Sequence, residues 1–259
     1  MLSTFRRIAE LNEFAFVHLN TLESGREVWG DKPTYFEEQR QRAESESDLP
    51  AIFCEFHSDF PDLSRCKNER GAVGIHIVRD PRDMLLSAVR FHLVSDEQWL
   101  HEPSEKFGGL TYQQQLTSFD TLEERVRFEI DHNMGRVIRK MFSFDRQGVF
   151  RDIRYEDLIV DVNMTLWHDI SIYLGMQGSE IIRSLEVFWR FSIFGKMKEL
   201  AQSGKHSHIF NGQPRQWQTQ LTPSILDMIQ GEFESEITGL GYELGCESDL
   251  CQSETACQA

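Results

Sequence analysis

The segment 74–93 constrains the fold of this chain more than any other. It is an apolar strand-like run ending at Arg79, followed by Asp80 and Pro81 and then an amphipathic run that carries Ser87. Aspartate suits the N-cap of a helix and proline suits the first helical position, so this pattern predicts a strand that leads directly into a helix. An arginine at a strand end is often only a surface ion pair. Its guanidinium can also fork onto phosphate oxygens, with Ser87 two turns along on the side of Asp80. We therefore expect a local anion site here.

Other segments predict the class of the fold. Apolar runs with the composition of buried strands occur at 51–56, 72–78 and 148–154, and a shorter run at 14–19 is a fourth candidate. A capping box at Thr121 and Glu124 predicts one long amphipathic helix that continues to Met141, and Thr222-Pro223 predicts the start of another. Strands that alternate with helices predict an α/β fold, with a parallel β-sheet flanked by helices and ligands at the carboxyl ends of the strands.

Length and composition limit the alternatives. The 259 residues suit one α/β domain over 1–242, with an acidic, loosely ordered tail over 243–259. A net charge of −15 argues against nucleic acid and membrane partners. No apolar run could span a bilayer and no secretory signal is visible, so we expect a cytoplasmic protein. The five cysteines form no C-x-x-C pair, so no metal is expected, although the cysteines and carboxylates of the tail could imitate a metal cluster.

The motif Arg-Asp-Pro-Arg-Asp-x-x-x-Ser from Arg79 to Ser87 resembles the 3′-phosphate-binding motif of sulfotransferases that use 3′-phosphoadenosine 5′-phosphosulfate (PAPS). Four further segments resemble parts of the same family, in the family's order along the chain. The resemblance implies the P-loop NTPase-like sulfotransferase fold and PAPS as sulfuryl donor. It also implies that Arg79 and Ser87 hold the 3′-phosphate.

The first of these segments contains His57. It follows the apolar run 51–56 at the place where the family has the catalytic histidine of Lys-Thr-His-x-Pro. An imidazole with a pKa near 6.5 can take the proton of an acceptor hydroxyl, so His57 is the candidate general base. A lone histidine near aromatic residues is also commonly structural. Glu55 stands where the family has a lysine, and it is a second candidate base.

Two segments resemble the parts of the family that contact adenine. Tyr155 begins Tyr-Glu-Asp-Leu, whose tyrosine contacts the base in the family, and an aromatic ring with a free edge can stack on a purine. Phe194 lies in a segment that resembles Ser-Phe-x-x-Met-Lys, whose phenylalanine packs on the adenine ring. Taken alone, Phe194 would be an ordinary core residue.

The last segment resembles the loop that closes over the 3′-phosphate. Gly212 holds its place in that pattern, whereas Phe210 and Asn211 stand where the family has a basic pair. Only the Asn211 amide and backbone N–H groups would remain as donors. The 3′-phosphate is therefore expected to bind more weakly than it would to a loop with the family's basic pair. Lys205 or Arg215 could compensate.

The family's Pro-Lys-x-Gly-Thr-Thr-Trp loop, which cradles the 5′-phosphosulfate, is not found. Ser3-Thr4-Phe5 would occupy the Thr-Thr-Trp positions, which places the first strand and the lysine upstream of Met1. The expectation is a fold that lacks its first strand and loop. Since each preorganised donor contributes on the order of 10²–10³ in rate, little or no turnover is expected.

Three functions follow from these patterns. The leading one is transfer of a sulfuryl group from PAPS to a hydroxyl or amine of a small-molecule or carbohydrate acceptor. The alternative is a catalytically impaired module that binds 3′-phosphoadenosine. A P-loop kinase is a weaker third option, because no Walker sequence occurs.

Overall fold

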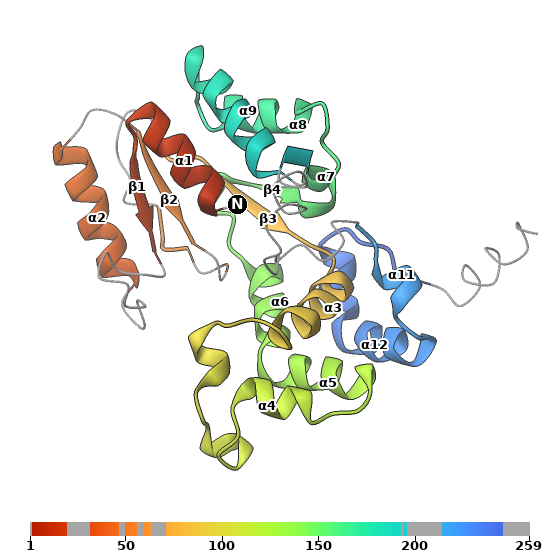
Figure 1. The fold of residues 1–259 in the computed structure, drawn as a ribbon. Helices are drawn as coiled ribbons and strands as arrows, with labels where there is room; N and C mark the ends of the chain where they lie inside the picture. The colour runs from red at the N-terminus through yellow and green to blue at the C-terminus, as the bar shows by residue number, and fades with distance from the viewer. Residues whose placement is uncertain are drawn as a thin grey trace, which may run out of the picture. The chain divides into compact units, whose positions relative to one another are not determined.

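A computed structural model of the chain describes residues 2–19, 32–46, 50–55, 58, 60–63, 71–192, 194–195 and 214–245. The chain divides into two compact units, and Figure 1 labels their helices and strands. The strand unit consists of Met1–Ile77 and Phe144–Gly212, and the helical unit consists of Val78–Ser143 and Gln213–Ala259. Each unit is built from two separate parts of the sequence. A single domain over 1–242 stays a prediction.

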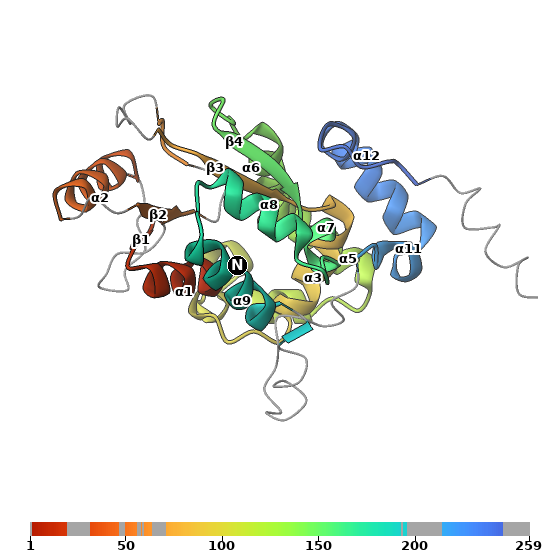
Figure 2. The same cartoon turned by 90° about the horizontal axis from the view of Figure 1, so that it is seen from above.

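The described residues of the strand unit form four strands, each at a place that the apolar runs predicted: β1 (Ala15–His18), β2 (Ala51–Cys54), β3 (Gly74–Val78) and β4 (Phe150–Arg154). Strand β1 pairs with β2 in parallel, from Ala15 opposite Ala51 to His18 opposite Cys54. Strand β3 pairs with β4, and Figure 2 shows these two strands side by side. The predicted α/β class, with parallel strands flanked by helices, is confirmed.

The helices of the strand unit are α1 (Leu2–Asn12), α2 (Lys32–Glu46), α7 (Tyr155–Ile159), α8 (Thr165–Tyr173) and α9 (Ser179–Phe191). Side chains of the β1–β2 pair alternate between two apolar clusters, as the period of two in a strand requires. Phe16 and Ile52 join the cluster that contains α1, whereas Val17 and Phe53 join the one that contains Phe36 of α2. Helices α1 and α2 therefore cover opposite faces of this pair (Figure 1).

The helical unit contains α3 (Pro81–His92), α4 (Tyr112–Thr117), α5 (Leu122–His132), α6 (Met134–Ser143), α11 (Trp217–Gln220) and α12 (Pro223–Gly239), with short 3₁₀ turns η1 (Gln98–His101) and η2 (Glu105–Phe107). The predicted helix start at Thr222-Pro223 is confirmed. Residues Ile225, Ile229, Phe233 and Ile237 recur every four positions on α12 and pack in one core with apolar residues of α3, α5 and α6. Among the described residues, no helix is long and apolar enough to cross a membrane.

The prediction of one long helix from Thr121 to Met141 is wrong. The capping box at Thr121 is present, but the helix breaks at Asn133, whose φ of −147° and ψ of −73° are not helical. A Cβ on Gly135 would lie 2.2 Å from the Ile130 carbonyl oxygen, so the second helix can start this close to the first only because this residue is glycine. The apolar spacing continues through the break and therefore did not reveal it.

Trp167 is a central residue of the core of the strand unit. Trp167 is almost fully buried, stacks on Phe188 at 4.4 Å between ring centroids and donates its indole N–H to Ser184 Oγ at 2.9 Å. We expect Trp167→Ala to lower the free energy of unfolding of this unit by about 3–5 kcal/mol, because a large cavity remains and Ser184 Oγ loses the indole N–H. Urea denaturation followed by circular dichroism measures the change. Trp189→Ala is the matched control, since Trp189 is 42% exposed, and equal losses in both variants would contradict this account of the core.

Candidate functional site

The junction between β3 and α3 has the form that the sequence predicts. Strand β3 ends at Val78, Asp80 is the N-cap of α3 and Pro81 is its first residue. The Asp80 carboxylate accepts a hydrogen bond of 2.9 Å from the backbone N–H of Arg82. Arg79 thus lies between the end of a strand and the start of a helix, and its side chain is half-buried.

The second arginine of the motif, Arg82, is structural. Its side chain is 1% exposed and forks onto both carboxylate oxygens of Asp80, at 2.9 Å from Nε and 2.8 Å from Nη2. The guanidinium carbon lies 3.7 Å from the centre of the Trp217 ring, and the remaining N–H groups donate to the Gln230 side chain and the Glu243 carbonyl. All of these partners are internal, so Arg82 is not available to a ligand.

Asp83, at the start of α3, forms hydrogen bonds with the backbone at the start of α11. Its two carboxylate oxygens accept the backbone N–H groups of Arg215 and Trp217, at 2.8 and 2.9 Å. Burial raises the pKa of the Asp83 carboxyl above its ordinary value, although these two N–H groups and the charge of Arg79 oppose the shift. Both oxygens of this carboxyl are thus engaged by backbone N–H groups at the start of α11.

Several donors surround this carboxyl. The charge of Arg79 acts on Asp83, Ser87 is half-buried one turn further along α3, and Arg215 is exposed while its backbone is fixed by Asp83. A Lys or Arg side chain, a hydroxyl and a helix N-terminus are the groups that bind phosphate in proteins. The start of α3 is therefore a candidate phosphate site, and the structure brings the predicted residues Arg79 and Ser87 into the same unit, together with Arg215.

Arg90 is a candidate that the sequence reasoning missed. It is half-buried, donates to the Gln216 side chain at 2.7 Å and interacts with the charge of Asp83. Burial lowers its pKa, although an arginine remains charged at physiological pH. The sequence could have identified Arg90 by its spacing. It lies seven residues after Asp83 and three after Ser87, which places all three on one face of a helix.

The other predicted residues belong to the strand unit or lie outside the described residues. Glu55 is half-buried directly after β2, and Tyr155 is the half-buried first residue of α7. Phe194 stacks on Trp189, with 5.8 Å between ring centroids and an interplanar angle of 19°, which the sequence reasoning did not foresee. His57, Asn211 and Gly212 lie outside the described residues. That all these residues form one site stays a prediction.

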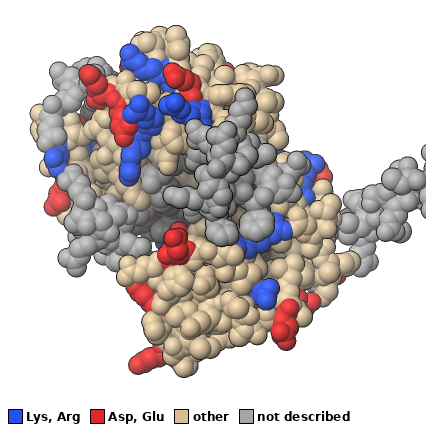
Figure 3. Space-filling view, in the orientation of Figure 1, with Lys and Arg blue, Asp and Glu red and all other residues tan. Residues whose placement is uncertain are grey.

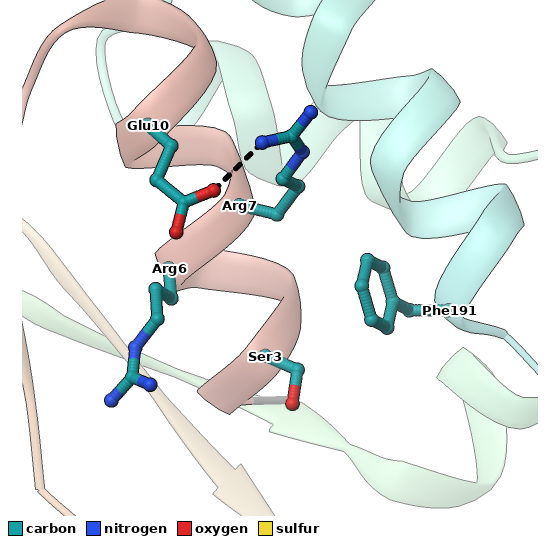
Figure 4. A pocket seen from close by; sticks show the side chains of 5 residues that line it. All are labelled: Ser3, Arg6, Arg7, Glu10 and Phe191. Atoms are coloured by element: carbon teal, nitrogen blue, oxygen red, sulfur yellow. Dashed lines mark hydrogen bonds and ion pairs between the residues drawn. The ribbon is translucent and has the colours of Figure 1, made fainter.

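A second concentration of positive charge lies at the start of α1. Ser3, Arg6, Arg7, Glu10 and Phe191 line a hollow, and Figure 4 shows Arg7 turned toward Glu10, with which it forms an ion pair of 2.8 Å. Arg6 lies over the ring of Phe16, with its guanidinium carbon 5.4 Å from the centre. In the space-filling view, basic side chains gather beside acidic ones on this part of the face (Figure 3). The positive charge here is thus partly balanced.

The described residues contain no group of three or more histidine, cysteine, aspartate or glutamate side chains placed to hold a metal ion. No model of a protein family matches the chain, and no curated protein matches it. A search of solved structures finds the crystal structure of the mouse sulfotransferase SULT7A1 complexed with PAP. The sequence identity is 16%, the match covers 100% of this chain and 95% of the mouse chain, and the TM-score is 0.48.

The two arginines of the motif should differ sharply when they are removed. We expect Arg82→Ala to lower the free energy of unfolding by about 3–5 kcal/mol, because it leaves the buried Asp80 carboxylate without its partner. Arg79→Ala should cost less than about 1 kcal/mol, since that side chain is half-buried. Chemical denaturation of both variants beside the wild type measures the difference. If Arg79→Ala were the more damaging change, the structural role would belong to Arg79 instead.

Proposed function

We propose that this chain binds 3′-phosphoadenosine nucleotides and acts as a sulfotransferase-type domain, with PAPS as the sulfuryl donor. The observation that carries the proposal is the arrangement at the start of α3. There Arg79 acts on the Asp83 carboxyl through its charge, Arg215 donates its backbone N–H to the same carboxyl, and Ser87 lies four residues further along α3, while Arg82 is paired with Asp80 inside the protein.

The 3′-phosphate is the group that suits this place. A phosphate monoester carries up to two negative charges and several acceptor oxygens, which a guanidinium, a hydroxyl and a helix N-terminus can satisfy together. Asp80, the other carboxylate of the junction, is neutralised by Arg82. The local charge at the start of α3 is therefore positive, although the chain as a whole carries a charge of −15.

The remaining roles rest on the order of the motifs. Tyr155 and Phe194 would contact the adenine, and the stack of Phe194 on Trp189 offers a larger aromatic surface than Phe194 alone. Asn211 and Gly212 would belong to the loop over the 3′-phosphate. His57, or Glu55 in its place, would accept the proton from the hydroxyl or amine of a small-molecule or carbohydrate acceptor. PAPS, when bound, supplies the sulfuryl group.

A second candidate function is binding without transfer. It is favoured by Phe210 and Asn211, which stand where the related loop has a basic pair. Ground-state contacts to adenine and the 3′-phosphate could persist in such a chain. Turnover would fall, because catalysis needs groups that stabilise the transition state.

Calorimetry with adenosine 3′,5′-bisphosphate tests the nucleotide site. We expect Arg79→Ala to weaken binding by about 1.5–3 kcal/mol, the usual scale of a hydrogen bond to a charged group. This corresponds to roughly 10- to 150-fold in Kd. Arg215→Ala should weaken binding in the same direction, since the backbone of Arg215 is held at the same carboxyl.

Arg136→Ala is the matched control, because Arg136 is exposed on α6 of the same unit. It should leave the affinity unchanged. Adenosine 5′-monophosphate, which lacks the 3′-phosphate, should bind wild type and Arg79→Ala alike. If wild type and Arg79→Ala bound the bisphosphate with equal affinity, the 3′-phosphate would not bind at Arg79.

A transfer assay separates the two functions. The assay uses labelled PAPS and a panel of phenols, alcohols and amines. If the wild type transfers sulfate, His57→Ala should lower the transfer rate by on the order of 10²–10⁴ while leaving the bisphosphate affinity unchanged. Glu55→Gln, tested beside it, identifies the base if His57→Ala retains activity. Wild type that binds the bisphosphate but transfers no sulfate would favour the binding module.

A further inference from the structure

A chain of hydrogen bonds in the strand unit joins three residues that neither the motifs nor the proposed function uses. Ser58 Oγ lies 3.1 Å from His76 Nε2, and His76 Nδ1 lies 2.9 Å from Asp152 Oδ1. His76 is on β3, Asp152 is on the paired strand β4, and Ser58 follows β2. Both ring nitrogens of one histidine thus connect a serine hydroxyl to a carboxylate.

We propose that Ser58, His76 and Asp152 form a nucleophile, a general base and an orienting carboxylate, able to hydrolyse carboxylic esters. The connectivity is the one that this chemistry needs: the base contacts the nucleophile through Nε2 while a carboxylate fixes the tautomer through Nδ1. The proposal does not depend on sulfate transfer.

The backbone at Ser58 supports a functional role. Its φ is 51°, in the left-handed region that residues other than glycine rarely adopt. Strained backbone of this kind concentrates at active sites, and a nucleophilic serine on a sharp turn after a strand is one example. Ser58 is only partly buried, so a substrate can reach its hydroxyl.

The surroundings suit the proton transfers. His76 is 7% exposed, and burial lowers its pKa below the ordinary value, although the hydrogen bond to Asp152 opposes the shift. Arg146 binds the other oxygen of Asp152, with Nη2 3.0 Å from Oδ2, and these hydrogen bonds lower the pKa of the Asp152 carboxyl despite partial burial. The histidine is therefore neutral and the aspartate ionised near neutral pH.

Aromatic rings indicate the class of ester. His76 stacks on Phe144 at 4.3 Å between ring centroids, Phe144 contacts Phe150 at 5.0 Å, and Phe150 contacts Phe60 at 5.3 Å. A site beside such rings favours an uncharged, apolar acyl group over a charged one.

The reaction proceeds in two balanced steps. Ser58 Oγ attacks the ester carbonyl carbon and gives its proton to His76 Nε2, which passes that proton to the departing alcohol as the ester C–O bond breaks. Water then attacks the acyl-serine and gives a proton to His76, which returns it to Ser58 Oγ. The products are one alcohol and one carboxylic acid, and water is the only co-reactant.

The test uses the full chain, a fluorophosphonate probe and p-nitrophenyl butyrate. We expect one covalent adduct, located on Ser58 by peptide mass mapping, and ester hydrolysis that Ser58→Ala abolishes. Ser45→Ala is the matched control, since Ser45 is exposed on α2 and should leave both unchanged. Asp152→Asn should slow labelling by at least about 100-fold, because the imidazole loses its orienting partner, whereas the exposed Asp157→Asn should not.

The pH profile gives a readout that a structural network would not produce. The groups that act on His76 are Asp152, Arg146 and Glu55. Labelling should fall on acidification with an apparent pKa below 6.5, where His76 becomes protonated. The proposal is overturned by a folded wild type that shows no Ser58 adduct, by labelling of Asp152→Asn at the wild-type rate, or by a rate that still rises above pH 8.

Discussion

The buried ion pair between Asp80 and Arg82 is the interaction on which the helical unit depends. It lies at the first turn of α3, and Arg82 also reaches Trp217, Gln230 and the Glu243 carbonyl. One guanidinium therefore connects the start of α3 to α11, α12 and the chain beyond α12. A buried pair of this kind contributes little compared with apolar residues of equal volume, but losing one partner is costly, because the other charge remains buried. The pair thus holds one arrangement of these helices.

This pair also explains why the junction can attract an anion in an acidic protein. Asp80 is neutralised internally, and Asp83 is used to hold the N–H groups of Arg215 and Trp217. Both carboxylates that would repel a phosphate are thus occupied by the fold. The positive charges of Arg79 and Arg215 lie near the N-terminus of α3, where a short-range field matters more than the net charge.

The polar residues of the strand unit form a different kind of hydrogen-bond network. Polar residues at buried strand positions are informative, because an unpaired polar group there is costly. His76 occupies such a position on β3, and its partner is Asp152 on the paired strand β4, whose carboxylate is exposed. In the helical unit, polar groups hold the start of α3 to α11 and α12. In the strand unit, they form a proton path that ends at a serine.

The strands and helix starts could be predicted because they depend on local properties. Apolar runs located the four strands of the described residues. Asp80-Pro81, Thr121 and Thr222 located three helix starts, since a cap is a contact between residues three or fewer apart. The break at Asn133 could not be predicted, because the apolar spacing continues through it and the turn depends on the approach of Gly135 to the Ile130 carbonyl.

Only part of the candidate site could be predicted from local sequence. The motif singled out Arg79 and Ser87, but it did not reveal that Arg82 is buried and paired inside the protein. What distinguishes Arg82 from Arg79 is the ring of Trp217, more than 130 positions away along the chain, which covers Arg82. The contact of Arg215 with Asp83 and those of His76 with Ser58 and Asp152 likewise join separate segments. Local sequence thus fixed where strands and helices begin, whereas burial and long-range contact determined which charged side chains are structural and which are available for chemistry.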